Sequence, residues 1–158
     1  MILQYPNKLL STKCREMALP EEEGLARNVG EALMEALKDT KRRSVGLSAN
    51  QIGMLYRVFV MDVKFLKVKA KSIFVNPEII WESMLLHDSN EECMSLPKHV
   101  KAKIARPWQV KLRYQTPSGK VREVDLEGLA ARCACHELDH LDGISILQRA
   151  EMQRKLSA

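Results

Sequence analysis

Apolar residues recur at every fourth position of the segment that follows Pro20. Leu25, Val29, Leu33 and Leu37 form this stripe, and such a recurrence places the side chains on one face of an α-helix. Pro20 and the three glutamates after it suit a first helical turn, because acidic groups are stabilised at the positive end of the helix dipole. The pattern predicts an amphipathic helix near the N-terminus, with its apolar face packed in the core.

Four strand-like runs lie further along the chain, at residues 56–61, 72–75, 108–114 and 121–124. Between the last two runs, Pro117 and Gly119 have the spacing of a hairpin turn. A second helix is predicted from about Asp125, whose side chain can cap it, to about Leu141, with Gly143 as a stop signal. This order of elements predicts an α+β fold, with antiparallel β-strands surrounding a central helix.

The composition is that of an ordinary folded protein. Its 158 residues are 46% hydrophobic and 28% charged, which fits a single catalytic domain over residues 1–158. The first ten residues lack the regions of a signal peptide, and no apolar run is long enough to span a bilayer. Four cysteines without the spacing of a disulfide framework suggest a reducing compartment, so a cytoplasmic location is expected.

The net charge of +5 comes from 25 basic and 20 acidic residues. Lysines cluster at positions 64, 67, 69 and 71 and again at positions 98, 101 and 103. Such clusters are most simply solvated faces, and weak attraction to a polyanion such as ribosomal RNA is the functional alternative. Aromatic residues make up only 5% of the chain and do not interleave with these lysines. The sequence therefore gives no support to base stacking or to sequence-specific binding of nucleic acid.

The most specific chemical signal is an HExxH motif, His136-Glu137-Leu138-Asp139-His140, inside the second predicted helix. Residues four apart share one helix face, so His136 and His140 can bind a single metal ion. Glu137 lies beside the first histidine, where a carboxylate can manage the proton of a metal-bound water. The motif predicts a metallohydrolase, against the alternative of two histidines and a glutamate on a solvated helix.

HExxH metallopeptidases take a third metal ligand from further along the chain, and none is evident here. In the metzincin pattern this ligand is a histidine six residues after the second motif histidine, a position held by Ile146. The only later glutamate is Glu151. Cys93, upstream of the motif, is a stronger candidate for the third metal ligand than Glu151. A lone cysteine is usually a small buried hydrophobe, but a Cys/His/His set leaves one position open for water, as in catalytic zinc sites.

Asp139, between the two motif histidines, has two interpretations. It is either a solvated helix charge or a buried acid that is held by a cation. Arg106 is the partner that we expect in the second case, because an arginine–carboxylate pair is strong and directional when it is shielded from water.

Three segments resemble, in the same order, the signatures GxGxAAxQ, EGCxS and QHExDH of the peptide deformylase family. They are Ser44-Val45-Gly46-Leu47-Ser48-Ala49-Asn50-Gln51, Glu91-Glu92-Cys93-Met94-Ser95 and Cys135-His136-Glu137-Leu138-Asp139-His140. The N-terminal Ile2-Leu3-Gln4-Tyr5-Pro6 also resembles the opening strand of the family. The resemblance therefore covers the chain from about residue 2 to Gly143.

Four positions depart from these signatures. Ser44 and Glu92 stand in place of glycines, Ser48 in place of an alanine and Cys135 in place of a glutamine. None of the four removes a candidate ligand, so we expect them to affect specificity and redox behaviour rather than the reaction class.

The resemblance implies hydrolysis of the N-formyl group from peptides that begin with formyl-methionine, with release of formate. The implied roles are metal ligands for Cys93, His136 and His140, proton shuttle for Glu137, and oxyanion donors for the Gln51 side chain and the Met94 backbone N–H. One thiolate and two imidazoles suit zinc, cobalt, nickel and ferrous iron alike, and the resemblance favours Fe(II). Because family members act on nascent chains, the ribosome surface is a candidate partner beside the peptide substrate.

The first side chain of the substrate is predicted to lie against the helix face that carries the metal. The expected lining residues are Val45, Gly46, Leu129, Arg132 and Cys133. The last three precede His136 by seven, four and three residues and so share its face. The resemblance implies an apolar residue at position 132. Arg132 is therefore expected to reach the pocket rim with its apolar stem as wall, against the alternative that it points into solvent.

Three other functions remain open from the sequence: a zincin-type endopeptidase, a non-catalytic relative that binds metal or blocked N-termini, and a structural zinc module. A structural zinc site normally has four protein ligands. A pure binder needs neither a proton shuttle at Glu137 nor an oxyanion donor at Gln51. A peptidase is distinguished by its action on unblocked internal bonds.

Overall fold

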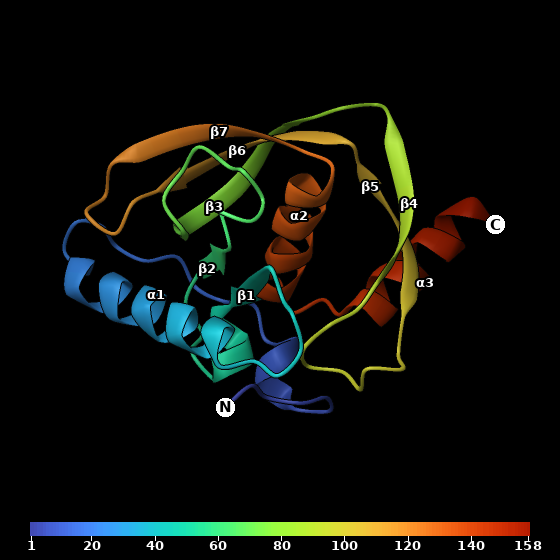
Figure 1. Cartoon of the computed structure of the whole chain (residues 1–158), viewed down its shortest axis with the longest axis horizontal. Coiled ribbons are helices and arrows are strands. Elements are labelled where there is room, and N and C mark those ends of the chain that lie inside the picture. The colour runs from blue at the N-terminus through green and yellow to red at the C-terminus, as the bar shows by residue number, and fades with distance from the viewer.

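The computed structural model describes residues 1–158, and its strands form two antiparallel sheets beside a central helix (Figure 1). The strands are β1 (Gly46–Ser48), β2 (Val58–Met61), β3 (Ile73–Glu82), β4 (Leu86–Glu91), β5 (Ala102–Pro107), β6 (Gln109–Gln115) and β7 (Val121–Glu127). One sheet has the order β1-β2-β3-β6-β7, and the other pairs β4 with β5. Helix α2 (Leu129–Leu141) contacts strands of both sheets. The predicted α+β class is confirmed.

The first predicted helix is α1 (Glu23–Lys38), which packs against β1 and β2. Its buried face includes Val29, Leu33 and Leu37 of the predicted stripe, together with Ala26. Leu25 is 36% exposed. The prediction is therefore wrong for Leu25, because the buried face begins one residue later, at Ala26.

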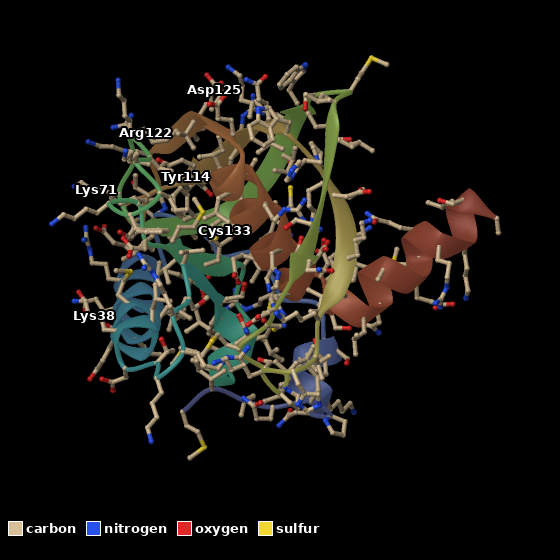
Figure 2. All side chains as sticks on the ribbon, turned by 45° about the vertical axis from the view of Figure 1, so that its right-hand side comes forward. Lys38, Lys71, Tyr114, Arg122, Asp125 and Cys133 are labelled. Carbon is tan, nitrogen blue, oxygen red and sulfur yellow. The ribbon has the colours of Figure 1, made fainter.

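The second predicted helix begins later than expected. Asp125 does not cap it but lies in β7, opposite Lys111 of β6, and its side chain is at the outer surface (Figure 2). The strand is followed by Gly128, which has φ +59 and donates its N–H to the carbonyl of Trp108. Glycine adopts this left-handed backbone without a steric penalty. α2 therefore begins at Leu129.

Several elements were not predicted: β1, β4, β5, two short 3-10 helices at Lys8–Ser11 and Ala49–Ile52, and α3 (Ile146–Ser157). β4 is mostly polar and is held by pairing with β5. α3 begins with a capping box between Ser145 and Gln148. The opening strand expected at residues 2–6 is absent, although Leu3 and Tyr5 donate backbone hydrogen bonds to Gln51 and Ser95.

The core is divided between the two sides of the large sheet. α1 covers one group of buried residues, which includes Leu33, Val58 and Val60. α2 covers the other group, in which Phe59 stacks on Phe74 with ring centroids 5.1 Å apart. α2 is therefore held by packing along its length, which fixes the position of the HExxH motif. None of the helices has both the length and the apolar character needed to cross a bilayer.

Candidate active site

Three side chains that could hold a metal ion converge at the centre of the molecule. His136 and His140 come from α2, and Cys93 lies in the loop after β4. His140 Nε2 is 3.2 Å from Cys93 Sγ and 3.2 Å from His136 Nε2. The three donor atoms lie within 4.8 Å of one another. One thiolate and two imidazoles at this spacing fit a single divalent metal ion. Cys133 and Cys135 do not belong to this group.

The two histidines differ in their surroundings. Burial and the neighbouring His136 hold the pKa of His140 well below its usual value, so its imidazole is neutral at pH 7. Burial alone also lowers the pKa of His136, but hydrogen bonds with Cys93 and Glu91 raise it to about 10. Asn50 donates to the carbonyl of His140 at 2.5 Å and ties the end of α2 to the 3-10 helix after β1.

Glu91, at the end of β4, orients His136. Its Oε1 is 2.9 Å from His136 Nδ1, and a partner on the second ring nitrogen fixes how a metal-binding histidine is oriented. The carboxylate also accepts two hydrogen bonds at 2.9 Å from Arg106. Burial raises the pKa of Glu91, but these partners outweigh it, and the pKa lies below its usual value. In the sequence, Glu91 is recognised only as the first residue of a motif, and its contact with His136 was not predicted.

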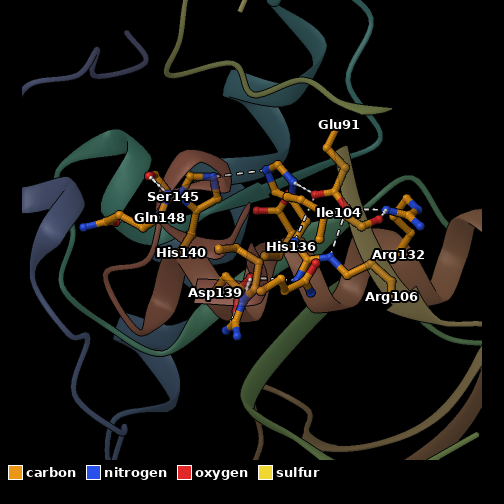
Figure 3. A network of polar contacts seen from close by, with 12 residues as sticks. Glu91, Ile104, Arg106, Arg132, His136, Asp139, His140, Ser145 and Gln148 are labelled. Atoms are coloured by element: carbon orange, nitrogen blue, oxygen red, sulfur yellow. Dashed lines mark hydrogen bonds and ion pairs between the residues drawn. The ribbon is translucent and has the colours of Figure 1, made fainter. Parts of the chain in front are cut away.

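The Asp139 carboxylate is the second acid of this buried network (Figure 3). Arg106 Nη1 lies 2.7 Å from its Oδ2, so the predicted pairing is present. Arg149 of α3 adds two hydrogen bonds at 2.6 and 3.0 Å. Arg106 therefore bridges Asp139 and Glu91, and Arg149 links α3 to α2, the helix that carries the candidate ligands His136 and His140. The role of Arg149 was not predicted, because it depends on a helix that the sequence pattern did not show.

The position of Arg132 differs from both expectations. It neither reaches the rim nor points into solvent, since it is only 8% exposed. Its guanidinium donates to Glu91 at 2.6 Å, to the Ile104 carbonyl at 3.0 Å and to the His87 carbonyl. A buried guanidinium is tolerated when its charge and its N–H groups are satisfied in this way. The expectation failed because it did not include these partners on β4 and β5.

Glu137 is buried next to the metal-binding group. Its Oε2 lies 2.6 Å from Ser48 Oγ. Burial raises the pKa of Glu137, although His136 and the Ser48 hydroxyl oppose the effect. A Cβ atom at Gly46 would lie 2.9 Å from Glu137 Oε1 and 2.6 Å from Cys133 Sγ. Glycine at position 46 therefore leaves the space that this carboxylate occupies.

Gln51 and Met94 lie beside the metal-binding group. The Gln51 side-chain carbonyl accepts the Ser48 N–H at 3.0 Å, while its Nε2 is 3.1 Å from Ser95 Oγ and 3.8 Å from Cys93 Sγ. The side-chain amide is thereby held with its nitrogen towards the site. The Met94 N–H makes no hydrogen bond within the chain. Two hydrogen-bond donors therefore lie near the three candidate ligands.

A cavity of about 430 Å³ opens next to these residues. It is lined by all five expected pocket residues, Val45, Gly46, Leu129, Arg132 and Cys133, and by Gln51, Cys93, Met94, His136 and Glu137. Figure 2 shows Cys133 inside the molecule. A larger cavity, of about 930 Å³, lies against the opposite face of α2 and is lined by Cys135 and Asp139. It contains none of the candidate ligands, so the smaller cavity is the one that fits the chemistry.

Comparisons with known proteins agree with this geometry. The model of the family described as polypeptide deformylase matches residues 1–156. A peptide deformylase of Rhodopseudomonas palustris is 35% identical, over 98% of this chain and 90% of its own. A peptide deformylase of Prochlorococcus marinus is 34% identical, and the match covers 81% of this chain and 66% of that relative. The crystal structure of the Thermotoga maritima peptide deformylase superposes with a TM-score of 0.82 at 32% identity, covering 94% of this chain and 95% of its own. The chain therefore belongs to the peptide deformylase family.

Proposed function

We propose that this protein is a metal-dependent peptide deformylase, which hydrolyses the N-formyl group of N-formyl-methionyl peptides of newly made proteins and releases formate. The observation that carries the proposal is the convergence of Cys93, His136 and His140 beside a cavity that Cys93, His136, Glu137 and Gln51 line. The family match supports the same activity.

The metal would be held by Cys93, His136 and His140. A bound divalent metal ion lowers the pKa of a coordinated water from about 15.7 to about 7 and so supplies a nucleophile at neutral pH. We propose Fe(II) as the native ion, with Zn(II), Ni(II) and Co(II) as alternatives, because this ligand set suits all four. Glu91, through its contact with His136 Nδ1, would keep that ring oriented for the metal.

Glu137 is the proposed proton shuttle. It takes a proton from the attacking water and later delivers it to the leaving amine of the substrate. General acid–base catalysis is most efficient when the pKa of the group lies near the working pH. Burial moves the pKa of Glu137 upward in that direction, and Ser48 keeps the carboxylate in place.

Gln51 and the Met94 N–H are the proposed donors to the oxyanion that develops on the formyl oxygen. Such donors stabilise a transition state when they are already oriented where the charge forms. The Gln51 amide is fixed by Ser48 and Ser95, and the Met94 N–H has no partner within the chain. The Met94 N–H is therefore available to the substrate, and the Gln51 amide becomes a donor to it by giving up its 3.8 Å contact with Cys93 Sγ.

The first side chain of the substrate is proposed to enter the cavity beside α2. Val45, Leu129 and Cys133 supply apolar surface there, and a flexible methionine side chain adapts well to such a wall. A cytoplasmic location and an encounter with nascent chains at the ribosome surface follow from this substrate class. We propose both on that basis.

A zincin-type endopeptidase is the alternative that the HExxH motif leaves open, and a non-catalytic metal-binding relative is the other. One comparison separates all three: incubation of metal-loaded protein with formyl-Met-Ala-Ser, with acetyl-Met-Ala-Ser and with casein. A deformylase releases formate from the first peptide and leaves the acetyl group and casein intact. Cleavage of casein would favour the peptidase, and no reaction with any of the three would favour the binder.

A further inference from the structure

Two neighbouring arginines, Arg42 and Arg43, line the candidate cavity but have different partners. Arg42 donates to the Leu96 carbonyl at 2.8 Å and to Glu92 at 3.2 Å. Arg43 makes no ion pair and no side-chain hydrogen bond within the chain. Its guanidinium lies over the ring of Phe65, 4.0 Å from the centroid. Arg43 therefore keeps an unpaired charge at the cavity.

No acidic group of the cavity is available to neutralise Arg43. Glu91 and Glu137 are buried and satisfied by other partners. Glu92 is paired with Arg42 and Lys101, which lower its pKa. Arg132, the other arginine of the cavity, uses its guanidinium inside the protein. Arg43 is thus the one arginine of the cavity that is free to meet an anionic group of a ligand.

Arg43 is held at the open side of the cavity. Both Arg43 and Phe65 are exposed, and Phe65 belongs to the segment that follows β2. That segment is tied to the loop that carries Arg43, because the Asp62 N–H donates to the Val45 carbonyl at 2.8 Å. A guanidinium that is stacked on an aromatic ring is preorganised, so it loses less freedom when it binds a carboxylate.

We infer that Arg43 gives the enzyme a preference for substrates whose second residue is acidic. The inference rests on the proposed function. If the formyl group lies at Glu137 and Gln51 and the first side chain lies against α2, the peptide must leave through the open side of the cavity. Arg43 is positioned there to meet the next side chain. A glutamate or aspartate supplies the carboxylate that Arg43 lacks, and a lysine is repelled.

The expected effect is modest and dependent on salt. Ion pairs of exposed groups change affinity by about two- to fivefold. The attraction operates equally in the bound substrate and in the transition state, so it changes KM and leaves kcat nearly constant. It weakens at about 1 M salt, where the Debye length falls to about 3 Å.

The test compares kcat/KM for formyl-Met-Glu-Ser, formyl-Met-Gln-Ser and formyl-Met-Lys-Ser. The wild-type protein is expected to prefer them in that order, with the difference in KM. Arg43→Gln should reduce the preference for Glu over Lys by about two- to fivefold, and Arg43→Glu should reverse it. Lys41→Gln is the matched control, because it removes the same charge from the same loop at an exposed residue that does not line the cavity.

An unchanged ratio in Arg43→Gln would overturn the inference while leaving the proposed function intact. An equal loss of preference in Lys41→Gln would also overturn it, since the effect would then come from general charge. A wild-type protein that releases formate from none of the three peptides would overturn the proposed function and this inference together.

Discussion

Ser48 Oγ lies 2.6 Å from Oε2 of Glu137, so the serine that replaces an alanine of the family signature is a direct partner of the proposed proton shuttle. From the sequence, this departure is a change between two small residues that should be tolerated. The structure adds that the Ser48 backbone N–H also orients Gln51. One residue therefore positions both the proposed acid–base group and the proposed oxyanion donor.

Ser48→Ala removes the hydroxyl contact with Glu137 and keeps the backbone contact with Gln51. A hydrogen bond to a charged group contributes about 1.5–3 kcal/mol, so we expect kcat to fall about ten- to a hundredfold while the metal content stays the same. Formate release and metal analysis on the same samples measure both quantities. Ser118→Ala, in the hairpin turn before β7, is the control. A Ser48→Ala enzyme with wild-type kcat would show that the contact has no part in turnover.

Cys93→Ala should lose the bound metal and the activity together. Cys93 Sγ belongs to the group of three donor atoms, and the two remaining imidazoles bind a divalent ion much more weakly than the full set. Cys135→Ala is the control, because Cys135 lines the cavity on the opposite face of α2. Metal analysis after gel filtration gives the result. Retention of one metal per chain by Cys93→Ala, with its loss from Cys135→Ala, would reverse the ligand assignment.

Arg132→Ile should change the preference among formyl-Met, formyl-Leu and formyl-norleucine peptides, because Arg132 lines the cavity. Pocket contacts of one methylene group contribute about 1–3 kcal/mol, so the ratios of kcat/KM should move roughly tenfold. The variant should also unfold at a lower temperature, because Glu91 and two backbone carbonyls lose a buried donor. Arg122→Ile, on the exposed side of β7, is the control for both measurements. Unchanged ratios would place Arg132 outside the substrate site.

Cys14 makes the folded state less stable in alkaline solution. Burial raises its pKa from 9.0 to about 11, although Arg57 opposes the effect. Between pH 9 and 11 the unfolded chain therefore binds fewer protons than the folded one, so the free energy of unfolding falls as the pH rises. The loss from this thiol is on the order of 2 kcal/mol. Urea unfolding at several pH values should show a shallower decline for Cys14→Ala, and an equal decline would exclude Cys14 as a cause.

The parts of the fold that the sequence predicted are those with a strong local pattern. The stripe of α1 and the hairpin between β6 and β7 depend on neighbouring residues, and both are present. β4 shows no apolar alternation, because its stability comes from pairing with β5. α2 starts late because residues 121–127 pair with β6, a tertiary contact that overrides the capping preference of Asp125.

The same distinction applies to the candidate site. The spacing of His136 and His140 is a local property of a helix, whereas Cys93 was singled out indirectly, from the missing downstream ligand and then from the family signatures. The buried position of Arg132 depends on Glu91 and on two backbone carbonyls from β4 and β5. Because β4 and β5 were not predicted, no partner for the charge of Arg132 could be named from the sequence.

The role of Glu137 is tested most directly by formate release from formyl-Met-Ala-Ser, with iron-loaded protein prepared without air. We expect turnover by the wild-type enzyme and one metal ion per chain in both the wild type and Glu137→Gln. The amide keeps the size of the side chain but cannot carry the proton, so kcat should fall by about 10²- to 10⁴-fold. A Glu137→Gln protein that retains its metal and works within a few-fold of the wild type would contradict the mechanism.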